Sequence, residues 1–267
     1  MILIGELING TRKAIKEAIA AKDAALIRNL ARAQAEAGAA FIDCNPGTVG
    51  EQESSDMRWL VENVQAVTDQ PVTFDSPNAE ALRAGLGAYG GQATPMINSI
   101  TLEGDRVGRI LPLVTEHGTN VIALAMSDRG VPDDVASRVE NANQLIGACT
   151  EAGVPPERIF LDPVITMVAQ DACAAMKVLE AVRTIRAGHP QVHITAGLSN
   201  ISFGLPHRAL LNRAFLAMMT AAGMDSAICD PLDQDLMAMM AAAEALTGRD
   251  EFCMGYIGAA RAGKLGA

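Results

Sequence analysis

The chain has 267 residues, enough for one large domain, and its net charge of −10 disfavours binding to nucleic acid or to an anionic membrane surface. No apolar run reaches the roughly 18 residues of a membrane-spanning helix, and the N-terminus lacks a basic leader. The five cysteines are widely spaced and never form C-x-x-C, which excludes a disulfide framework and the familiar zinc patterns. We therefore expect a cytoplasmic protein with reduced, mostly buried thiols.

Short apolar or β-branched segments alternate with longer helical segments along the chain. The predicted strands cover residues 2–5, 40–44, 72–75, 95–98, 120–125, 158–161, 193–196 and 226–229. The predicted helices cover residues 23–37, 56–67, 78–89, 105–117, 134–152, 172–187, 210–222 and 233–246, with an extra helix at 12–21. Eight strand–helix units in a chain of this length predict a single (β/α)8 TIM barrel, one domain spanning 1–267. The glycine-rich tail after Phe252 is expected to fray.

In such a barrel the active site lies at the carboxyl ends of the strands. Those ends are rich in carboxylates and amides, whereas all five lysines fall on predicted helices or in the tail. This distribution disfavours a Schiff-base aldolase, which needs an amine in the pocket. The residues at the strand ends are Glu6, Asn9, Asp43, Asn45, Asp75, Ser76, Asn78, Asn98, Ser99, Ser127, Asp128, Asp162, Ser199, Asn200, Asp230 and Asp233.

A ring of carboxylates and amides suits a flat, donor-rich heterocycle or a metal ion. A pterin fits the first description, because its 2-amino group and N3–H form a guanidine-like edge that a carboxylate accepts in bidentate fashion. An asparagine amide matches the mixed donor and acceptor edge that remains. A magnesium site built from Asp43, Asp75, Asp162 and Asp230 stays open as an alternative.

Seven segments of the sequence resemble those of a known family, and the most specific of them is the sixth, GLSNISFGLP (197–206). They are IGELING (4–10), FIDCNPG (41–47), FDS (74–76), MINS (96–99), LDP (161–163), GLSNISFGLP (197–206) and NRAFL (212–216). Together they resemble the methyltetrahydrofolate:corrinoid protein methyltransferases of the pterin-binding family, to which the folate domain of cobalamin-dependent methionine synthase is related. The resemblance covers essentially the whole chain.

The resemblance implies that Asp75, Asn98 and Asp162, together with Asp43, hold the pterin. It also implies that Asn200 reaches N5, the atom that carries the methyl group, and is the catalytic residue. A neutral tertiary amine is a poor leaving group, and an amide hydrogen bond that strengthens as charge develops on N5 stabilises the transition state. Further residues are expected to surround this set, namely Glu6, Asn9, Ser199 and Ser202.

Most of these residues also have a structural interpretation, whereas Asn98 at a strand end has none. Asp75 suits a helix cap, Asn200 a turn, and Asp43, Asp162 and Asp230 can stabilise loops. The chain has no D-x-H-x-x-G motif of cobalamin-binding domains, so the resemblance implies a corrinoid carried by a separate protein. It also has no cysteine cluster for zinc, and it lacks the late basic motifs of dihydropteroate synthases.

The expected function is therefore exchange of a methyl group between N5 of methyltetrahydrofolate and the cobalt of a partner corrinoid protein, with no intrinsic metal and with the direction undetermined. The resemblance also implies a homodimer. Two alternatives remain: a non-catalytic folate-binding subunit of a corrinoid methyltransferase complex, and a metal-dependent barrel lyase or hydrolase.

Overall fold

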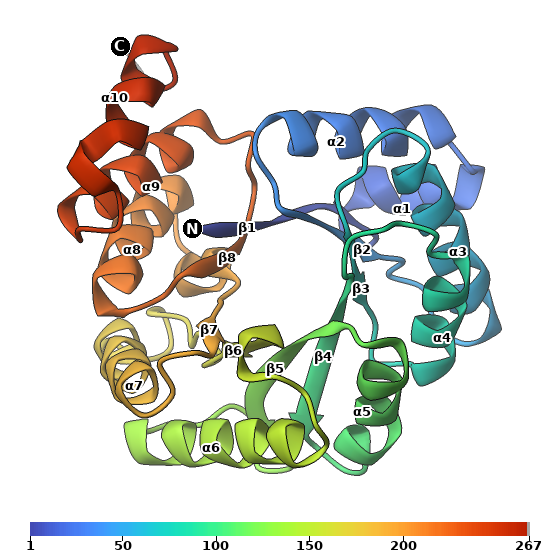
Figure 1. The fold of residues 1–267 in the computed structure, drawn as a ribbon, viewed down its shortest axis with the longest axis horizontal. Coiled ribbons are helices and arrows are strands. Elements are labelled where there is room, and N and C mark those ends of the chain that lie inside the picture. Colours follow the sequence, from blue (N-terminus) through green and yellow to red (C-terminus); the bar gives the residue numbers. More distant parts are fainter. Residues whose placement is uncertain (266–267) are drawn as a thin grey trace.

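The computed structural model describes residues 1–265, which form eight parallel strands wrapped into a barrel and surrounded by helices (Figure 1). The strands are β1 (Ile2–Asn9), β2 (Phe41–Asn45), β3 (Val72–Asp75), β4 (Met96–Leu102), β5 (Asn120–Ser127), β6 (Ile159–Asp162), β7 (His193–Ile194) and β8 (Ser226–Cys229). They pair in chain order from β1 to β7, and β8 pairs with β1. The amides of Asp225 and Ile228 donate to the carbonyls of Ile194 and Ala196, and these bonds close the barrel between β7 and β8.

The helices form a ring around the strands, and α10 lies at the outer edge next to α9 (Figure 1). They are α1 (Lys13–Ala21), α2 (Ala24–Glu36), α3 (Glu51–Gln65), α4 (Ala79–Ala88), α5 (Arg106–His117), α6 (Val135–Glu151), α7 (Ala174–Gly188), α8 (Arg208–Ala222), α9 (Gln234–Leu246) and α10 (Met254–Arg261). Short 3-10 turns are η1 (Pro156–Arg158), η2 (Leu198–Ser202) and η3 (Glu251–Cys253). None of the helices described between residues 1 and 265 is long and apolar enough to cross a membrane.

Local sequence explains where several helices begin. Four of them start directly after an Asp or Asn whose side chain accepts a backbone N–H of the first turn, and these residues are Asp23, Asn78, Asp134 and Asp233. Such side chains satisfy amide groups that have no partner within the helix. The predicted starts at 23, 78, 134 and 233 are therefore confirmed.

The structure differs from the prediction in several places. Strands β1 and β4 each continue four residues beyond their predicted ends. Helix α3 begins five residues earlier than predicted, with Glu51 and Glu53 in the first turn, where the helix dipole favours carboxylates. Strand β7 has only two residues, because the chain leaves the sheet towards η2. The tail after Phe252 forms α10 up to Arg261 instead of fraying, and it packs on α9.

Candidate functional site

The barrel interior is closed at the amino ends of its strands by an apolar plug. The plug consists of Ile4, Met96, Ile122 and Phe160, with Ile2, Phe41 and Ile228 packed against it. Because side chains alternate along a strand, the residues two positions later also face the interior, nearer the carboxyl ends. These residues are Glu6, Asp43, Asn98, Leu124, Asp162 and Asp230, so an almost wholly polar layer covers the plug.

Asp75 lies at the end of β3, directly opposite Asn98 of β4 in the strand register. Its Oδ2 accepts a hydrogen bond from Nδ2 of Asn45 at 2.7 Å. Burial raises the pKa of Asp75 to about 6, the Asn45 hydrogen bond opposes this shift, and the charge of Glu53 adds to it. Asp75 does not cap α4, because Asn78 has that role.

Asp43 is almost completely buried on β2, two residues before Asn45. Burial raises its pKa well above the usual range, the charge of Asp75 raises it further, and the amide of Asn98 lowers it. Its Oδ1 has no hydrogen-bond partner among residues 1–265. Asp43, Asp75 and Asn98 therefore form one connected group on three neighbouring strands.

Asp162 ends β6 and is also buried. Its Oδ1 accepts from the backbone N–H of Val164 at 2.8 Å, so the carboxylate does stabilise its own loop. Burial raises its pKa to about 6, while the amides of Val164 and Gly197 and the charge of Arg138 oppose that shift. The amide of Gly197 connects Asp162 to the segment that contains Asn200.

Arg138 anchors the loop that follows Asp162. Its guanidinium is buried and donates to the carbonyls of Pro163, Val164 and Pro132. Val164 has a φ of 60°, an unusual backbone conformation for a β-branched residue, which therefore needs support from its surroundings.

Replacing Arg138 with alanine is expected to lower the free energy of unfolding by about 3–5 kcal/mol, because it leaves buried carbonyls without partners. Chemical denaturation measures this loss. The matched control is Arg129→Ala, since Arg129 is exposed, and its change should stay within about 0.5 kcal/mol. Equal stability of the two variants would contradict the anchoring role.

Asn200 lies in η2 and is exposed, with its Nδ2 beside the Cα of Gly197. The turn is held by Arg208 of α8, which donates to the carbonyl of Ser199 at 2.6 Å and to Oγ of Ser202 at 3.1 Å. Oγ of Ser202 in turn donates to Oδ1 of Asn212 at 2.7 Å. Asn200 is therefore a solvent-accessible amide on a firmly held turn.

The other predicted residues lie at the same end of the barrel. Glu6 pairs with Arg12, and burial raises its pKa, an effect that the charge of Arg12 opposes. Asn9 accepts from the backbone and hydroxyl of Thr11, so it organises its own loop. Asp230 similarly accepts from the amide of Leu232.

Three residues of this site were not singled out from the sequence as site residues: Asn45, Glu53 and Arg208. Asn45 was visible as a strand-end amide, but only the structure shows that it contacts Asp75. Glu53 lies in α3, where it accepts from Ser76 and Asn78, and no motif marks it. Arg208 lies between the sixth segment of the resemblance, which ends at residue 206, and the predicted helix 210–222, so no motif marks it.

The cysteines differ in their burial, and the potential metal ligands do not form a metal-binding group in the described part of the chain. Cys44, Cys149 and Cys229 are buried, as expected of most of the cysteines, whereas Cys173 and Cys253 are exposed. In the described part of the chain, no three His, Cys, Asp or Glu side chains form an arrangement that could hold a metal ion.

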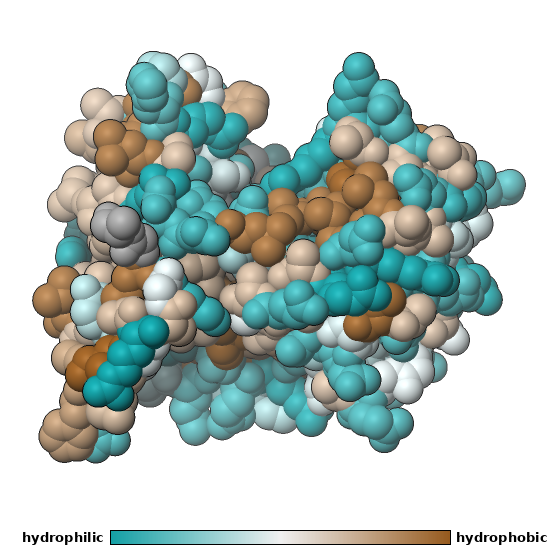
Figure 2. Space-filling model, turned by 90° about the horizontal axis from the view of Figure 1, so that it is seen from above, coloured by the Kyte–Doolittle hydropathy of each residue, from teal (hydrophilic) through white to brown (hydrophobic). Residues whose placement is uncertain are grey.

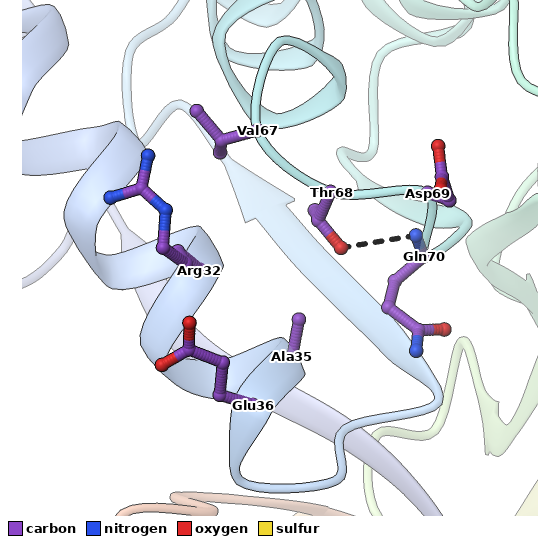
Figure 3. A pocket seen from close by; sticks show the side chains of 7 residues that line it. All are labelled: Arg32, Ala35, Glu36, Val67, Thr68, Asp69 and Gln70. Carbon is purple, nitrogen blue, oxygen red and sulfur yellow. Dashed lines mark hydrogen bonds between the residues drawn. The ribbon is translucent and has the colours of Figure 1, made fainter.

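A separate hollow of about 550 Å³ lies near the other end of the barrel, where α2 ends and the chain enters β3 (Figure 3). Its charged side chains, Arg32, Glu36 and Asp69, are exposed to solvent. The hollow therefore lacks the buried carboxylates and amides that gather at the carboxyl ends of the strands.

Comparison with known proteins identifies the family. The family model described as pterin binding enzyme matches residues 5–230. The methylcorrinoid:tetrahydrofolate methyltransferase of Eubacterium limosum is 37% identical over 268 residues, covering 100% of this chain and 98% of that protein. The methionine synthase of Mycobacterium leprae is 34% identical over 241 residues, covering 85% of this chain but only 20% of that protein.

Among solved structures, dihydropteroate synthase of Yersinia pestis has a TM-score of 0.68 and 20% identity, covering 92% of this chain and 93% of that one. At this identity the likeness concerns the fold alone. The match of the pterin binding model to most of the chain, with the full-length relative, shows that the protein belongs to the family of pterin-binding enzymes.

Proposed function

We propose that this chain is an enzyme that transfers a methyl group between N5 of methyltetrahydrofolate and the cobalt of a corrinoid carried by a separate protein. The observation that carries the proposal is the group of polar side chains above the plug, in which Asp75 and Asp162 end β3 and β6 and Asn98 lies on β4, directly opposite Asp75. The names of the relatives support it, since one refers to methylcorrinoid and tetrahydrofolate and another to methionine synthase.

In this proposal the pterin lies on the polar layer with its guanidine-like edge towards the carboxylates. Asp75 and Asp162 have pKa values of about 6, so both are mainly ionised at neutral pH and can accept hydrogen bonds from the 2-amino group and N3–H. Asn98 offers both a donor and an acceptor to the remaining edge. Asp43, buried behind them, has an oxygen that still lacks a partner.

The chemistry assigned to Asn200 concerns the leaving group. The Co(I) nucleophile attacks the methyl carbon, the N5–methyl bond breaks with its electron pair on N5, and N5 gains a proton as methyl-Co(III) forms. The amide of Asn200 donates a hydrogen bond to N5 that strengthens as charge develops there. The reverse direction uses the same contacts, so the site serves both.

The partner corrinoid must approach from the open side of the polar layer. The loops and the first turn of α8 at this end carry apolar side chains exposed to solvent, with Val49 exposed by 86%, Leu210 by 70% and Phe203 by 59%. Exposed apolar groups around a polar site are typical of a surface that a partner covers. The net charge of −10 does not support nucleic acid or an anionic membrane as the partner of this surface.

The proposal extends to one cytoplasmic domain spanning 1–267 that forms a homodimer. Apolar side chains are exposed on α8, α9, η3 and α10, and brown surface appears on the left of Figure 2, the side where Figure 1 places α9 and α10. Among these side chains Leu246 is exposed by 88% and Phe252 by 82%, which favours coverage by a second copy.

The proposed function is tested with free reduced cobalamin and methyltetrahydrofolate in an anaerobic stopped-flow experiment. The enzyme is expected to convert Co(I) to methyl-Co(III), visible as loss of the Co(I) absorbance, at a rate proportional to enzyme concentration. Folate binding without any conversion, also with corrinoid proteins as acceptors, would instead identify a non-catalytic folate-binding subunit. Inhibition by chelators would favour a metal-dependent lyase or hydrolase.

A further inference from the structure

The side-chain amide of Asn45 satisfies both of its hydrogen-bond partners in one orientation only, and in that orientation it donates to Asp75. Its Oδ1 accepts from the backbone N–H of Gly47 at 2.8 Å, and its Nδ2 donates to Oδ2 of Asp75 at 2.7 Å. An amide has one acceptor end and one donor end. Because the acceptor end is fixed by Gly47, the donor end must face Asp75.

The backbone around Asn45 is held by the neighbouring loop. The N–H of Gly10 donates to the carbonyl of Asn45 at 2.8 Å, and the backbones of Gly10 and Gly47 touch so closely that neither position has room for a Cβ. Gly47 also has a φ of 64°, a conformation that glycine adopts without strain. Asn45 therefore has little freedom to move away from Asp75.

The groups that face Asp75 are otherwise neutral or negatively charged. Asp43 and Cys44 come from β2, Glu53 from α3, and Asn98 from β4. The hydrogen bond from Asn45 opposes the rise in the pKa of Asp75 that burial and Glu53 cause. Asn45 occupies one lone pair of Oδ2, so Oδ1 and the second lone pair of Oδ2 remain to accept the N–H groups of a ligand.

We propose that Asn45 is a positioning residue: it orients the carboxylate of Asp75 and keeps it ionised, so that the carboxylate accepts the guanidine-like edge of the pterin. This inference rests on the proposed function, because it assumes that Asp75 binds the pterin. It assigns no contact between Asn45 and the methyl group or the cobalt.

The sharpest variant is Asn45→Asp, which keeps an oxygen for the N–H of Gly47 and replaces the donor to Asp75 by a second carboxylate. Affinity for methyltetrahydrofolate, measured by calorimetry at pH 7.5, is expected to fall by about 10-fold. The pH at which affinity declines on acidification should shift upwards, because Asp75 then binds a proton more readily. Asn45→Ala should shift it in the same direction.

The matched control is Asn120→Asp, an amide at the opposite end of the barrel that donates to the carbonyls of Thr94 and Pro95. Its affinity for folate and its pH profile should equal those of the wild type. A purely structural role of Asn45 would lower affinity equally at every pH and leave the profile in place, which would overturn the inference.

Asp75→Ala separates this inference from the function on which it rests. Should Asp75→Ala bind folate as the wild type does, the assignment of Asp75 to the pterin fails. Should Asp75→Ala lose binding while Asn45→Asp binds normally across the pH range, only the positioning role of Asn45 fails.

Discussion

Replacing Asn200 with alanine is expected to slow single-turnover methyl transfer by about 10²–10³-fold, with little change in the dissociation constant of methyltetrahydrofolate. The reason is that the amide acts on charge that develops on N5 only in the transition state, and loss of such a contact costs about 2.7–4 kcal/mol. Asn200 is exposed on η2 and is not part of the barrel core, so the fold should persist.

Two further variants sharpen this test. Asn200→Asp has nearly the same shape but lacks the N–H donor, so it should be about as slow as the alanine variant. Asn29→Ala, an exposed asparagine of α2, should keep wild-type rates. If Asn200→Ala weakened folate binding as strongly as it slowed transfer, the residue would be a binding group and its transition-state role would be refuted.

Replacing Asp75 with alanine is expected to weaken methyltetrahydrofolate binding by about 30- to 5,000-fold, measured by calorimetry. This range corresponds to a loss of about 2–5 kcal/mol in binding free energy. The loss is expected because the donor edge of the pterin would no longer have its carboxylate partner inside a half-buried site. At saturating folate, the rate of transfer should recover most of its wild-type value. A variant with intact affinity and a slow chemical step would reverse the roles given to Asp75 and Asn200.

The same carboxylate should lower the stability of the protein at neutral pH. Its pKa is about 6 in the folded protein and about 3.9 in an unfolded chain, so folding favours the protonated form. The stability that this preference contributes is present below about pH 4 and is lost as the pH rises through 6. Asp75→Asn should therefore be more stable than the wild type by about 1–3 kcal/mol at pH 8, with the difference fading near pH 4.

Much of the candidate site was predictable because short stretches of sequence show where each strand lies, and the barrel topology then places the strand ends on one side. Asp75 and Asp162 end apolar strands, and Asn98 follows the first apolar residues of β4. Every strand of such a barrel ends at the same side, so the arrival of these residues on one side of the barrel follows from the pattern. The starts of α2, α4, α6 and α9 were predictable for a similar reason, since one capping side chain determines each.

The contacts between loops were not predictable. The bond from Asn45 to Asp75 depends on how the β1 and β2 loops cross at Gly10 and Gly47, and the support of Asn200 depends on Arg208 reaching back from α8. These contacts join residues that are far apart in the sequence or lie in irregular loops. The two-residue period of strands and the 3.6-residue period of helices therefore do not predict them. The helical tail after Phe252 was missed because its glycines suggested fraying, whereas contacts with α9 support the helix.

A crystal structure of the enzyme with bound methyltetrahydrofolate would locate the pterin directly. We expect its 2-amino and N3–H edge within hydrogen-bonding distance of Asp75 and Asp162, its other polar edge at Asn98, and N5 facing the amide of Asn200 on the open side of the barrel. A pterin bound in the hollow near Arg32 and Gln70, or one with N5 turned towards the apolar plug, would contradict the proposed mechanism.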